Sequence, residues 1–262
     1  MRLGISTAAF YGHFETEEAA SFIGALPLEC AEVFLQGPSE WERSFVRDVR
    51  ARLGGVSCTS VHPLGTDFEN GMFSRSARKR RDTLDIICRV LDAGAELGAG
   101  MYVYHGRFAP RHELCPWNLR ANADVLALMC EEAEKRGMFI AWENVEWCQL
   151  TDESRVREAR LAVPQVRYTL DIKQAMRAGR DPFEMARAMG DRLVNVHVCD
   201  WDEQGKLCLP GEGTFDFAGF FALLRSLGYG GPVILEPYLA LIKSDTALER
   251  SIAYLKNAML AE

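Results

Sequence analysis

The sequence alternates along its whole length between short apolar runs and amphipathic segments. Eight of the runs are rich in valine, isoleucine and aromatic residues, a composition typical of strands that are buried on both faces. Strands of that kind form parallel sheets, whose crossover connections are usually helices. The alternation therefore restricts the chain to an α/β fold. The runs are RLGIS from residue 2, ECAEVFL from 29, VSCTSVH from 56, AGMYVYH from 99, MFIAWEN from 138, VRYTLDI from 166, LVNVHVC from 193 and PVILEPY from 232.

Helix signals occupy the segments between the runs. Asp181 followed by Pro182 is typical of a helix start, because aspartate caps free N–H groups and proline fits the first turn. Ser39 and Glu42 predict a capping box at the start of another helix. Eight strands and about eight helices fit a single (β/α)8, or TIM, barrel spanning residues 1–262. The alternative, a doubly wound open sheet, is disfavoured because no GxGxxG phosphate loop follows the first run.

Composition limits the partners that the chain is expected to have. A net charge of −7 argues against nucleic-acid binding, which depends on neutralising phosphates. No apolar run approaches the roughly 18 residues that cross a bilayer, so we expect no membrane association. The eight cysteines include no CxxC pair, and the chain does not open on a secretory signal. These features predict reduced thiols and a cytoplasmic location.

One basic stretch departs from the acidic balance. It contains Arg75, Arg78, Lys79, Arg80 and Arg81. We favour a solvated first turn of a helix, and the alternative is a patch that binds phosphate or a partner.

Polar side chains fall where the predicted strands end. The carboxyl ends of barrel strands meet at one rim, which is where TIM-barrel active sites lie. Ionisable groups are costly in apolar strands unless they are paired or bound to metal. Polar residues at the ends of seven of the eight runs therefore predict an active site. The residues are Glu32, His62, His105, Glu143, Asn144, Asp171, Asn195, His197, Asp200 and Glu236.

Four of these residues, from four consecutive runs, make up a set of potential metal ligands. Glu143, Asp171, His197 and Glu236 supply three carboxylates and one imidazole. Such oxygen-rich ligation suits Mn²⁺, Mg²⁺ or Co²⁺ better than a thiolate zinc site would. We therefore predict a divalent metal centre at the rim. His13 and His112 lie in predicted loops and are expected at the surface.

Five motifs, taken in their order and spacing, resemble those of the xylose isomerase-like barrels. That family includes ketose 3-epimerases, inosose dehydratases and endonuclease IV, and the resemblance covers essentially the whole chain. It implies that Glu143, Asp171, His197 and Glu236 hold one divalent ion. Mn²⁺ is favoured, with Mg²⁺, Co²⁺ or Zn²⁺ as alternatives. The motifs are AWENVE (141–146), TLDIKQA (169–175), NVHVCD (195–200), LPGEGTFDF (209–217) and VILEPY (233–238).

The chain departs from the family pattern in three respects. Gln174 stands where the trinuclear nuclease members and the epimerases have a histidine. Gly205 and Leu207 stand where the nuclease members have an Asp-x-His. These replacements argue against endonuclease activity and for a single ion. The stretch CDWDEQGK lacks the arginine that epimerases carry after the histidine, so the substrate need not be a free ketohexose.

The resemblance implies chemistry on a small polyhydroxy carbonyl compound. A divalent ion that chelates a carbonyl and a neighbouring hydroxyl acidifies the adjacent C–H and stabilises an enediolate. Glu143 and Glu236 are the expected acid–base pair, because they come from different runs and can approach the substrate from opposite faces. His62, His105 and Gln174 are expected to bind substrate hydroxyls. The leading hypothesis is a metal-dependent sugar or cyclitol isomerase or epimerase.

Two other hypotheses stay open at this level. Loss of a hydroxyl β to the carbonyl would make the protein a dehydratase of the inosose or dehydroshikimate type. The chain could also be a barrel subunit that needs a partner chain for activity. We further expect a homo-oligomer.

Overall fold

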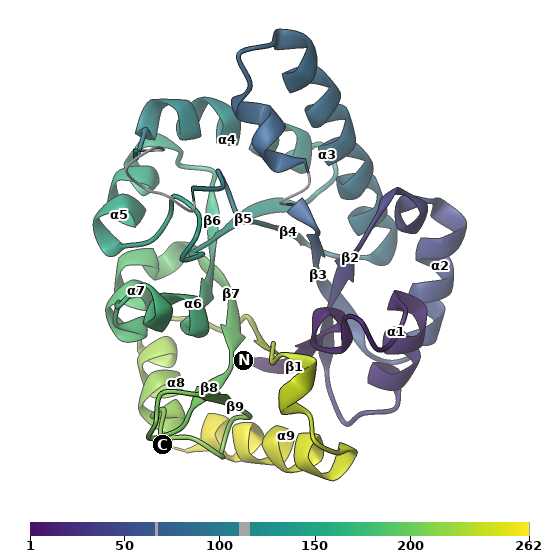
Figure 1. Cartoon of the computed structure of the whole chain (residues 1–262), viewed down its shortest axis with the longest axis vertical. Helices are drawn as coiled ribbons and strands as arrows, with labels where there is room; N and C mark the ends of the chain where they lie inside the picture. The colour runs from purple at the N-terminus through teal and green to yellow at the C-terminus, as the bar shows by residue number, and fades with distance from the viewer. Residues whose placement is uncertain (66–67, 110–115, 262) are drawn as a thin grey trace.

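Eight parallel strands close into a barrel in the computed structural model, which describes residues 1–65, 68–109 and 116–261 (Figure 1). The strand order around the barrel is β1-β10-β7-β6-β5-β4-β3-β2. The predicted TIM barrel is confirmed, and each of the eight predicted runs overlaps one barrel strand. The strands are β1 Arg2–Ser6, β2 Cys30–Leu35, β3 Ser57–Pro63, β4 Met101–Tyr104, β5 Phe139–Glu143, β6 Arg167–Asp171, β7 Leu193–Val198 and β10 Pro232–Leu235.

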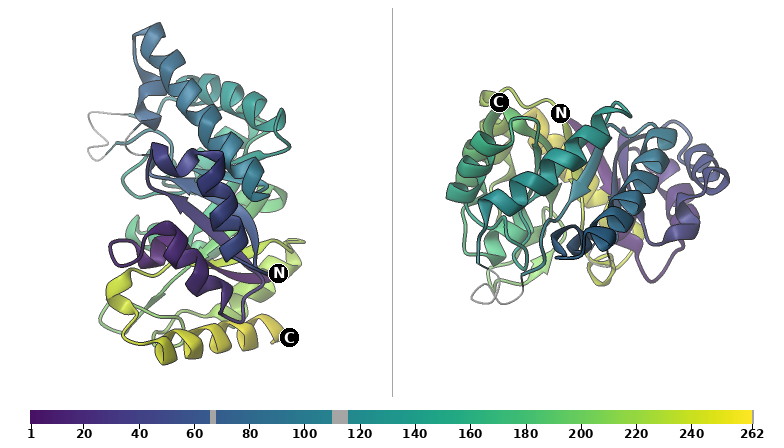
Figure 2. Two further views of the ribbon diagram at one scale, coloured as in Figure 1. Left: turned by 90° about the vertical axis from the view of Figure 1, so that its right-hand side faces the viewer. Right: turned by 90° about the horizontal axis from the view of Figure 1, so that it is seen from above.

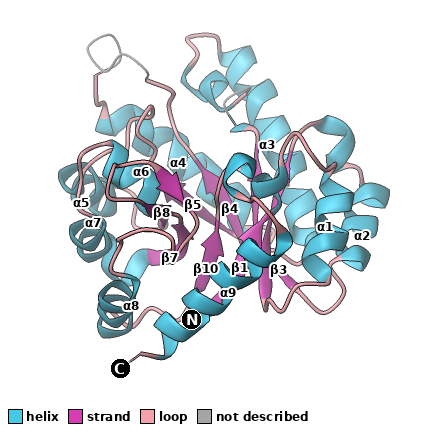
Figure 3. Ribbon diagram, turned by 60° about the horizontal axis from the view of Figure 1, so that its bottom comes forward, coloured by secondary structure: helices cyan, strands magenta, loops and turns pink. Residues whose placement is uncertain are grey.

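Helices surround the barrel and cover the outer faces of its strands (Figure 3). Their buried sides pack against the strands in a continuous apolar core, as expected for strands buried on both faces. The helices are α1 Thr16–Gly24, α2 Arg43–Arg52, α3 Ala77–Leu97, α4 Leu119–Glu134, α5 Glu153–Ala162, α6 Ile172–Arg177, α7 Pro182–Met189, α8 Phe217–Ser226 and α9 Asp245–Leu260.

One small sheet lies outside the barrel and was not predicted. Strands β8 (Asp200–Trp201) and β9 (Leu207–Cys208) pair antiparallel beyond the carboxyl end of β7. Each strand is too short to leave a periodic signal in the sequence.

The helix starts agree with the sequence in part. Asp181 caps α7, with its side chain accepting a hydrogen bond from the backbone of Phe183. The predicted capping box of Ser39 and Glu42 is wrong. A short 3₁₀ helix, Pro38–Trp41, occupies that position, and α2 starts only after Glu42. Proline at the first position of this 3₁₀ turn favours an earlier start.

Both termini lie at the same end of the barrel (Figure 2). Because β1 starts at that end, the carboxyl ends of the parallel strands face the opposite end.

The basic stretch is exposed and lies at the start of α3 and just before it, as favoured from the sequence. The seven described cysteines are free, and Cys115 lies outside the described residues. Among the helices described, none has the length and hydropathy needed to span a bilayer.

Candidate active site and metal centre

The four predicted metal ligands come from the carboxyl ends of neighbouring strands. Glu143 ends β5, Asp171 ends β6, His197 is the penultimate residue of β7 and Glu236 follows β10. The strand register pairs Asp171 directly with His197. All four side chains are buried, and one ligand atom of each lies within 4.8 Å of the others. The structure thus brings the predicted set together, while its role as a metal centre stays a prediction.

The atoms of this cluster suit a divalent cation. His197 Nδ1 lies 3.0 Å from Glu143 Oε1 and 3.5 Å from Glu236 Oε2. Glu143 Oε2 and Asp171 Oδ2 are buried without a hydrogen-bond partner among the described residues, although His105 Nε2 approaches the former to 3.0 Å. Buried polar atoms rarely stay unsatisfied, because losing water without replacement is costly. A cation held by three carboxylates and one imidazole would satisfy both oxygens.

Opposite charges inside the cluster shift one another's pKa values. Burial disfavours ionisation, but Lys173 and His197 hold the pKa of the Glu236 carboxyl well below its usual range. His197 and His105 likewise hold the pKa of the Glu143 carboxyl below its usual range. Burial likewise opposes protonation of His197, yet the surrounding carboxylates raise its pKa well above the usual value. Burial raises the pKa of Asp171 to about 6, against the effect of Lys173. A metal would therefore bind in exchange for protons.

Glu32, in the middle of β2, holds two of the histidines in place. Its side chain is 0% exposed and accepts hydrogen bonds from Ser60 Oγ at 2.8 Å and Asn195 Nδ2 at 3.1 Å. Its carboxylate oxygens also lie 3.0 Å from His197 Nε2 and 3.2 Å from His62 Nδ1. A carboxylate on the outer nitrogen of an imidazole fixes the ring so that the other nitrogen faces the site. The sequence places Glu32 among the polar strand residues but gives it no role.

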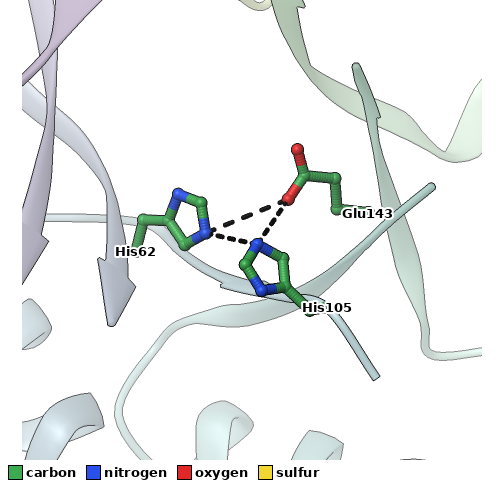
Figure 4. A group of neighbouring side chains, drawn as sticks. All are labelled: His62, His105 and Glu143. Atoms are coloured by element: carbon green, nitrogen blue, oxygen red, sulfur yellow. Dashed lines mark hydrogen bonds and ion pairs between the residues drawn. The ribbon is translucent and has the colours of Figure 1, made fainter. Parts of the chain in front are cut away.

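His62 and His105 lie next to Glu143, a member of the cluster (Figure 4). Their Nε2 atoms are 2.7 Å apart. Glu143 Oε2 lies 3.0 Å from His105 Nε2 and 3.9 Å from His62 Nε2. These three residues also meet the geometric criterion for holding a metal ion, as do Glu32, His62 and Glu236. The location of the two histidines is thus established, and substrate binding stays their predicted role.

Gln174 and Asn144 support Asp171. The backbone N–H of Gln174 donates to Asp171 Oδ1 at 2.9 Å, which leaves Oδ2 for the cluster. The Asn144 side chain forms two hydrogen bonds, both of 2.9 Å, with the backbone of Asp171. The Gln174 side-chain oxygen accepts a hydrogen bond from the backbone of Glu146. A role for Gln174 in substrate binding stays a prediction, whereas its backbone contribution to the site is evident.

Asp200 organises the loop that follows β7 rather than the cluster. Its carboxylate accepts hydrogen bonds from the backbone N–H groups of Trp201, Gly211, Gly213 and Phe215. A Cβ added at Gly213 would lie 2.3 Å from the Trp201 carbonyl oxygen and 2.4 Å from Asp200 Oδ1. Glycine is therefore required there for close backbone approach.

A further buried carboxyl, that of Glu69, lies close enough to His105 to interact with it electrostatically. Glu69 belongs to a 3₁₀ helix, Glu69–Phe73, that follows β3, and its Oε1 accepts a hydrogen bond from the hydroxyl of Tyr102 at 3.0 Å. Burial raises its pKa to about 7, although His105 and Tyr102 act to lower it. Glu69 was not predicted from the sequence, because this short 3₁₀ helix lies between two predicted elements.

The raised pKa of Glu69 makes stability depend on pH. Between about pH 4.5 and 7 the folded protein keeps a proton on Glu69 that the unfolded chain loses, so stability falls as pH rises. We expect the effect of Glu69→Gln on the free energy of unfolding to be roughly 3 kcal/mol more stabilising at pH 8 than at pH 4, because burial raises the pKa from 4.5 to about 7 and one pKa unit corresponds to about 1.4 kcal/mol. Urea unfolding at both pH values measures this difference. If the free energy of unfolding of the variant depended on pH in the same way as that of the wild type, the prediction would be wrong.

The closed barrel, with its polar cluster at the carboxyl rim, defines the chain as a TIM-barrel protein with a candidate metal centre. The sequence profile of the family described as xylose isomerase-like TIM barrel matches residues 22–258. The chain belongs to this family.

Individual relatives cover the chain to different extents. An uncharacterized protein of Mycobacterium leprae (strain TN) is 33% identical over 99% of this chain and 98% of its own length. A 3-dehydroshikimate dehydratase of Pseudomonas putida KT2440 is 27% identical over 90% of this chain, which spans only 38% of that enzyme. The crystal structure of a D-psicose 3-epimerase, determined in the presence of D-fructose, has a TM-score of 0.81 with 15% identity, and the match covers 99% of each chain. This last likeness establishes the fold alone.

Proposed function

We propose that the protein is a divalent-metal-dependent sugar or cyclitol isomerase or epimerase. The observation that carries the proposal is the buried cluster of Glu143, Asp171, His197 and Glu236, in which two carboxylate oxygens have no hydrogen-bond partner within the described part of the chain. These residues would hold the ion, and Mn²⁺ is favoured over Mg²⁺, Co²⁺ and Zn²⁺ for a set with three carboxylates. The substrate would be a small polyhydroxy carbonyl compound.

A bound divalent ion would polarise a carbonyl oxygen and favour formation of an enediolate. The protein's own residues would supply the proton transfers. Glu143 and Glu236 come from β5 and β10, which β6 and β7 separate in the barrel, so the two carboxylates reach the site from different sides. One would remove a proton and the other would return one to the opposite face. His62 and His105, whose Nε2 atoms lie 3.9 Å and 3.0 Å from Glu143 Oε2, would donate hydrogen bonds to substrate hydroxyls.

A dehydratase is the second candidate function. It is favoured by the relative named 3-dehydroshikimate dehydratase, which is 27% identical over 90% of this chain. Dehydration would share the first proton removal and differ in its second half, because a hydroxyl β to the carbonyl would leave. The same carboxylates could serve both reactions.

Proton NMR in D₂O distinguishes the two candidates. The purified protein, supplied with Mn²⁺ and then stripped of free ion, is incubated with a panel of ketoses and inososes. Isomerase or epimerase chemistry should replace a carbon-bound proton by deuterium and produce a second sugar. Dehydration should instead produce a vinylic signal. Absence of both, with metal bound, would contradict the proposed function for the substrates tested.

A further inference from the structure

A lysine ammonium lies among the carboxylates of the cluster. Lys173 is the second residue of α6, and its side chain is 6% exposed. Its Nζ lies 3.1 Å from Glu236 Oε2 and 3.5 Å from Asp171 Oδ2, and it also donates to the backbone oxygen of Glu236 at 3.4 Å. One permanent cation therefore bridges two carboxylates that come from β6 and β10.

The surroundings of Lys173 hold its ammonium in this position. A buried charge is tolerated only when it is paired and hydrogen-bonded. The Tyr238 ring adds a cation–π contact, with its centroid 5.0 Å from Nζ. Asp171 Oδ2 has no hydrogen-bond partner among the described residues, so the ammonium 3.5 Å away balances its charge electrostatically.

Lys173 thus contacts two of the four side chains that would bind the metal. We propose that Lys173 is a positioning residue that sets the affinity of the cluster for its divalent ion, because its ammonium competes with the ion for Asp171 and Glu236. This inference rests on the metal centre of the proposed function. An ammonium so close to two ligands repels a dication strongly, since neither charge is screened by bulk water.

The same contact has a second consequence for protein stripped of metal. Four carboxylates are buried in this region, three at the rim and that of Glu32 further inside the barrel; they belong to Glu32, Glu143, Asp171 and Glu236. Without a counter-charge they would repel one another or take up protons. Lys173 supplies one positive charge where a metal would supply two. It therefore keeps Asp171 and Glu236 together before an ion binds, at the cost of weaker metal binding.

The test replaces the ammonium by an apolar side chain of similar length. Lys173→Met should bind Mn²⁺ roughly 10–100-fold more tightly than the wild type, the range by which groups next to metal ligands change affinity. Affinity is measured for every variant at the same pH, 8, by competition with a chelating dye. Stripped of metal, Lys173→Met should melt at a lower temperature than the wild type. Its Tm should rise more when Mn²⁺ is added, because tighter binding stabilises more.

Arg177 offers a matched control on the same helix. Its guanidinium donates to the Tyr238 hydroxyl at 2.8 Å and lies over the same ring, but it is exposed, and no contact between it and the two carboxylates is found in the described part of the chain. Arg177→Met should leave Mn²⁺ affinity unchanged. Lys173→Arg restores a cation and should bring affinity back towards the wild-type value. Lys173→Gln serves if the methionine variant does not fold.

The outcomes separate this inference from the proposed function. Equal or weaker Mn²⁺ binding by folded Lys173→Met or Lys173→Gln would overturn the competition between ammonium and metal, while the metal centre itself would stand. Tighter binding by Arg177→Met as well would show a general charge effect and would overturn a specific role for Lys173. No Mn²⁺ binding by the wild type or any variant would overturn the metal centre, and this inference with it.

Discussion

Glu143→Gln and Glu236→Gln should each lower turnover by about 10²–10⁴-fold, the usual contribution of a general base. Glutamine has nearly the same shape and still offers an oxygen to a metal, but it cannot accept the substrate proton. Both variants should therefore keep part of their bound metal. Steady-state kinetics with the substrate found by NMR measures the loss. Glu212→Gln is the matched control and should keep full activity, because Glu212 is exposed; it lies in the LPGEGTFDF motif (209–217).

Hydrogen exchange in these variants tests the mechanism itself. For an epimerase, each variant should still introduce deuterium into one stereoisomer, and the two variants should prefer opposite stereoisomers. For an isomerase or a dehydratase, a single base starts the reaction, so only one variant should abolish exchange. If exchange continued at the wild-type rate in both variants with metal retained, the two glutamates would not be the acid–base pair.

His197→Ala should lose metal and activity together. His197 Nδ1 faces Glu143 and Glu236, while Glu32 holds the other ring nitrogen, so the imidazole is fixed towards the cluster. Removing a ligand held in this way should weaken Mn²⁺ binding by at least 100-fold. Elemental analysis after gel filtration should find about one ion per wild-type chain and almost none in the variant.

The control for this experiment is His13→Ala. His13 is exposed, as predicted, whereas His112 lies outside the described residues. Equal metal content in His197→Ala and His13→Ala would show that His197, the residue from β7, is not a ligand of the proposed centre. Two ions per wild-type chain would contradict the prediction of a single ion. His62, His105 and Glu143 would then be the candidate ligands of the second ion.

The sequence predicts the barrel and the strand ends because both depend on local patterns. An apolar run that ends on a charged residue is visible without a structure, and the rim of a TIM barrel collects such ends. The positions of Glu143, Asp171 and Glu236 at the rim were predicted in this way. The two-residue strands β8 and β9 and the loop carboxyl Glu69 have no such pattern, so they could not be predicted.

Contacts between strands depend on register, which the sequence does not specify. The pairing of β2 with β3 shifts between Ala31 and Glu32, and this irregularity sets Glu32 opposite Ser60. A shift of one residue would turn a side chain to the other face of the sheet. The position of the Lys173 side chain is equally hard to predict from the sequence, because it depends on α6 starting immediately after Asp171. The supporting residues of the site therefore required a structure.

The position of Glu32 has a consequence for how the chain folds. Glu32 lies in the second strand to be synthesised, but its partner Asn195 follows 163 residues later. Until β7 joins the barrel, the buried carboxylate lacks the donors from Asn195 and His197. An amino-terminal fragment would thus have to bury an under-compensated charge, which disfavours a stable half-barrel intermediate. Closing so long a loop is slow, so the active site should form late, together with the closure of the barrel.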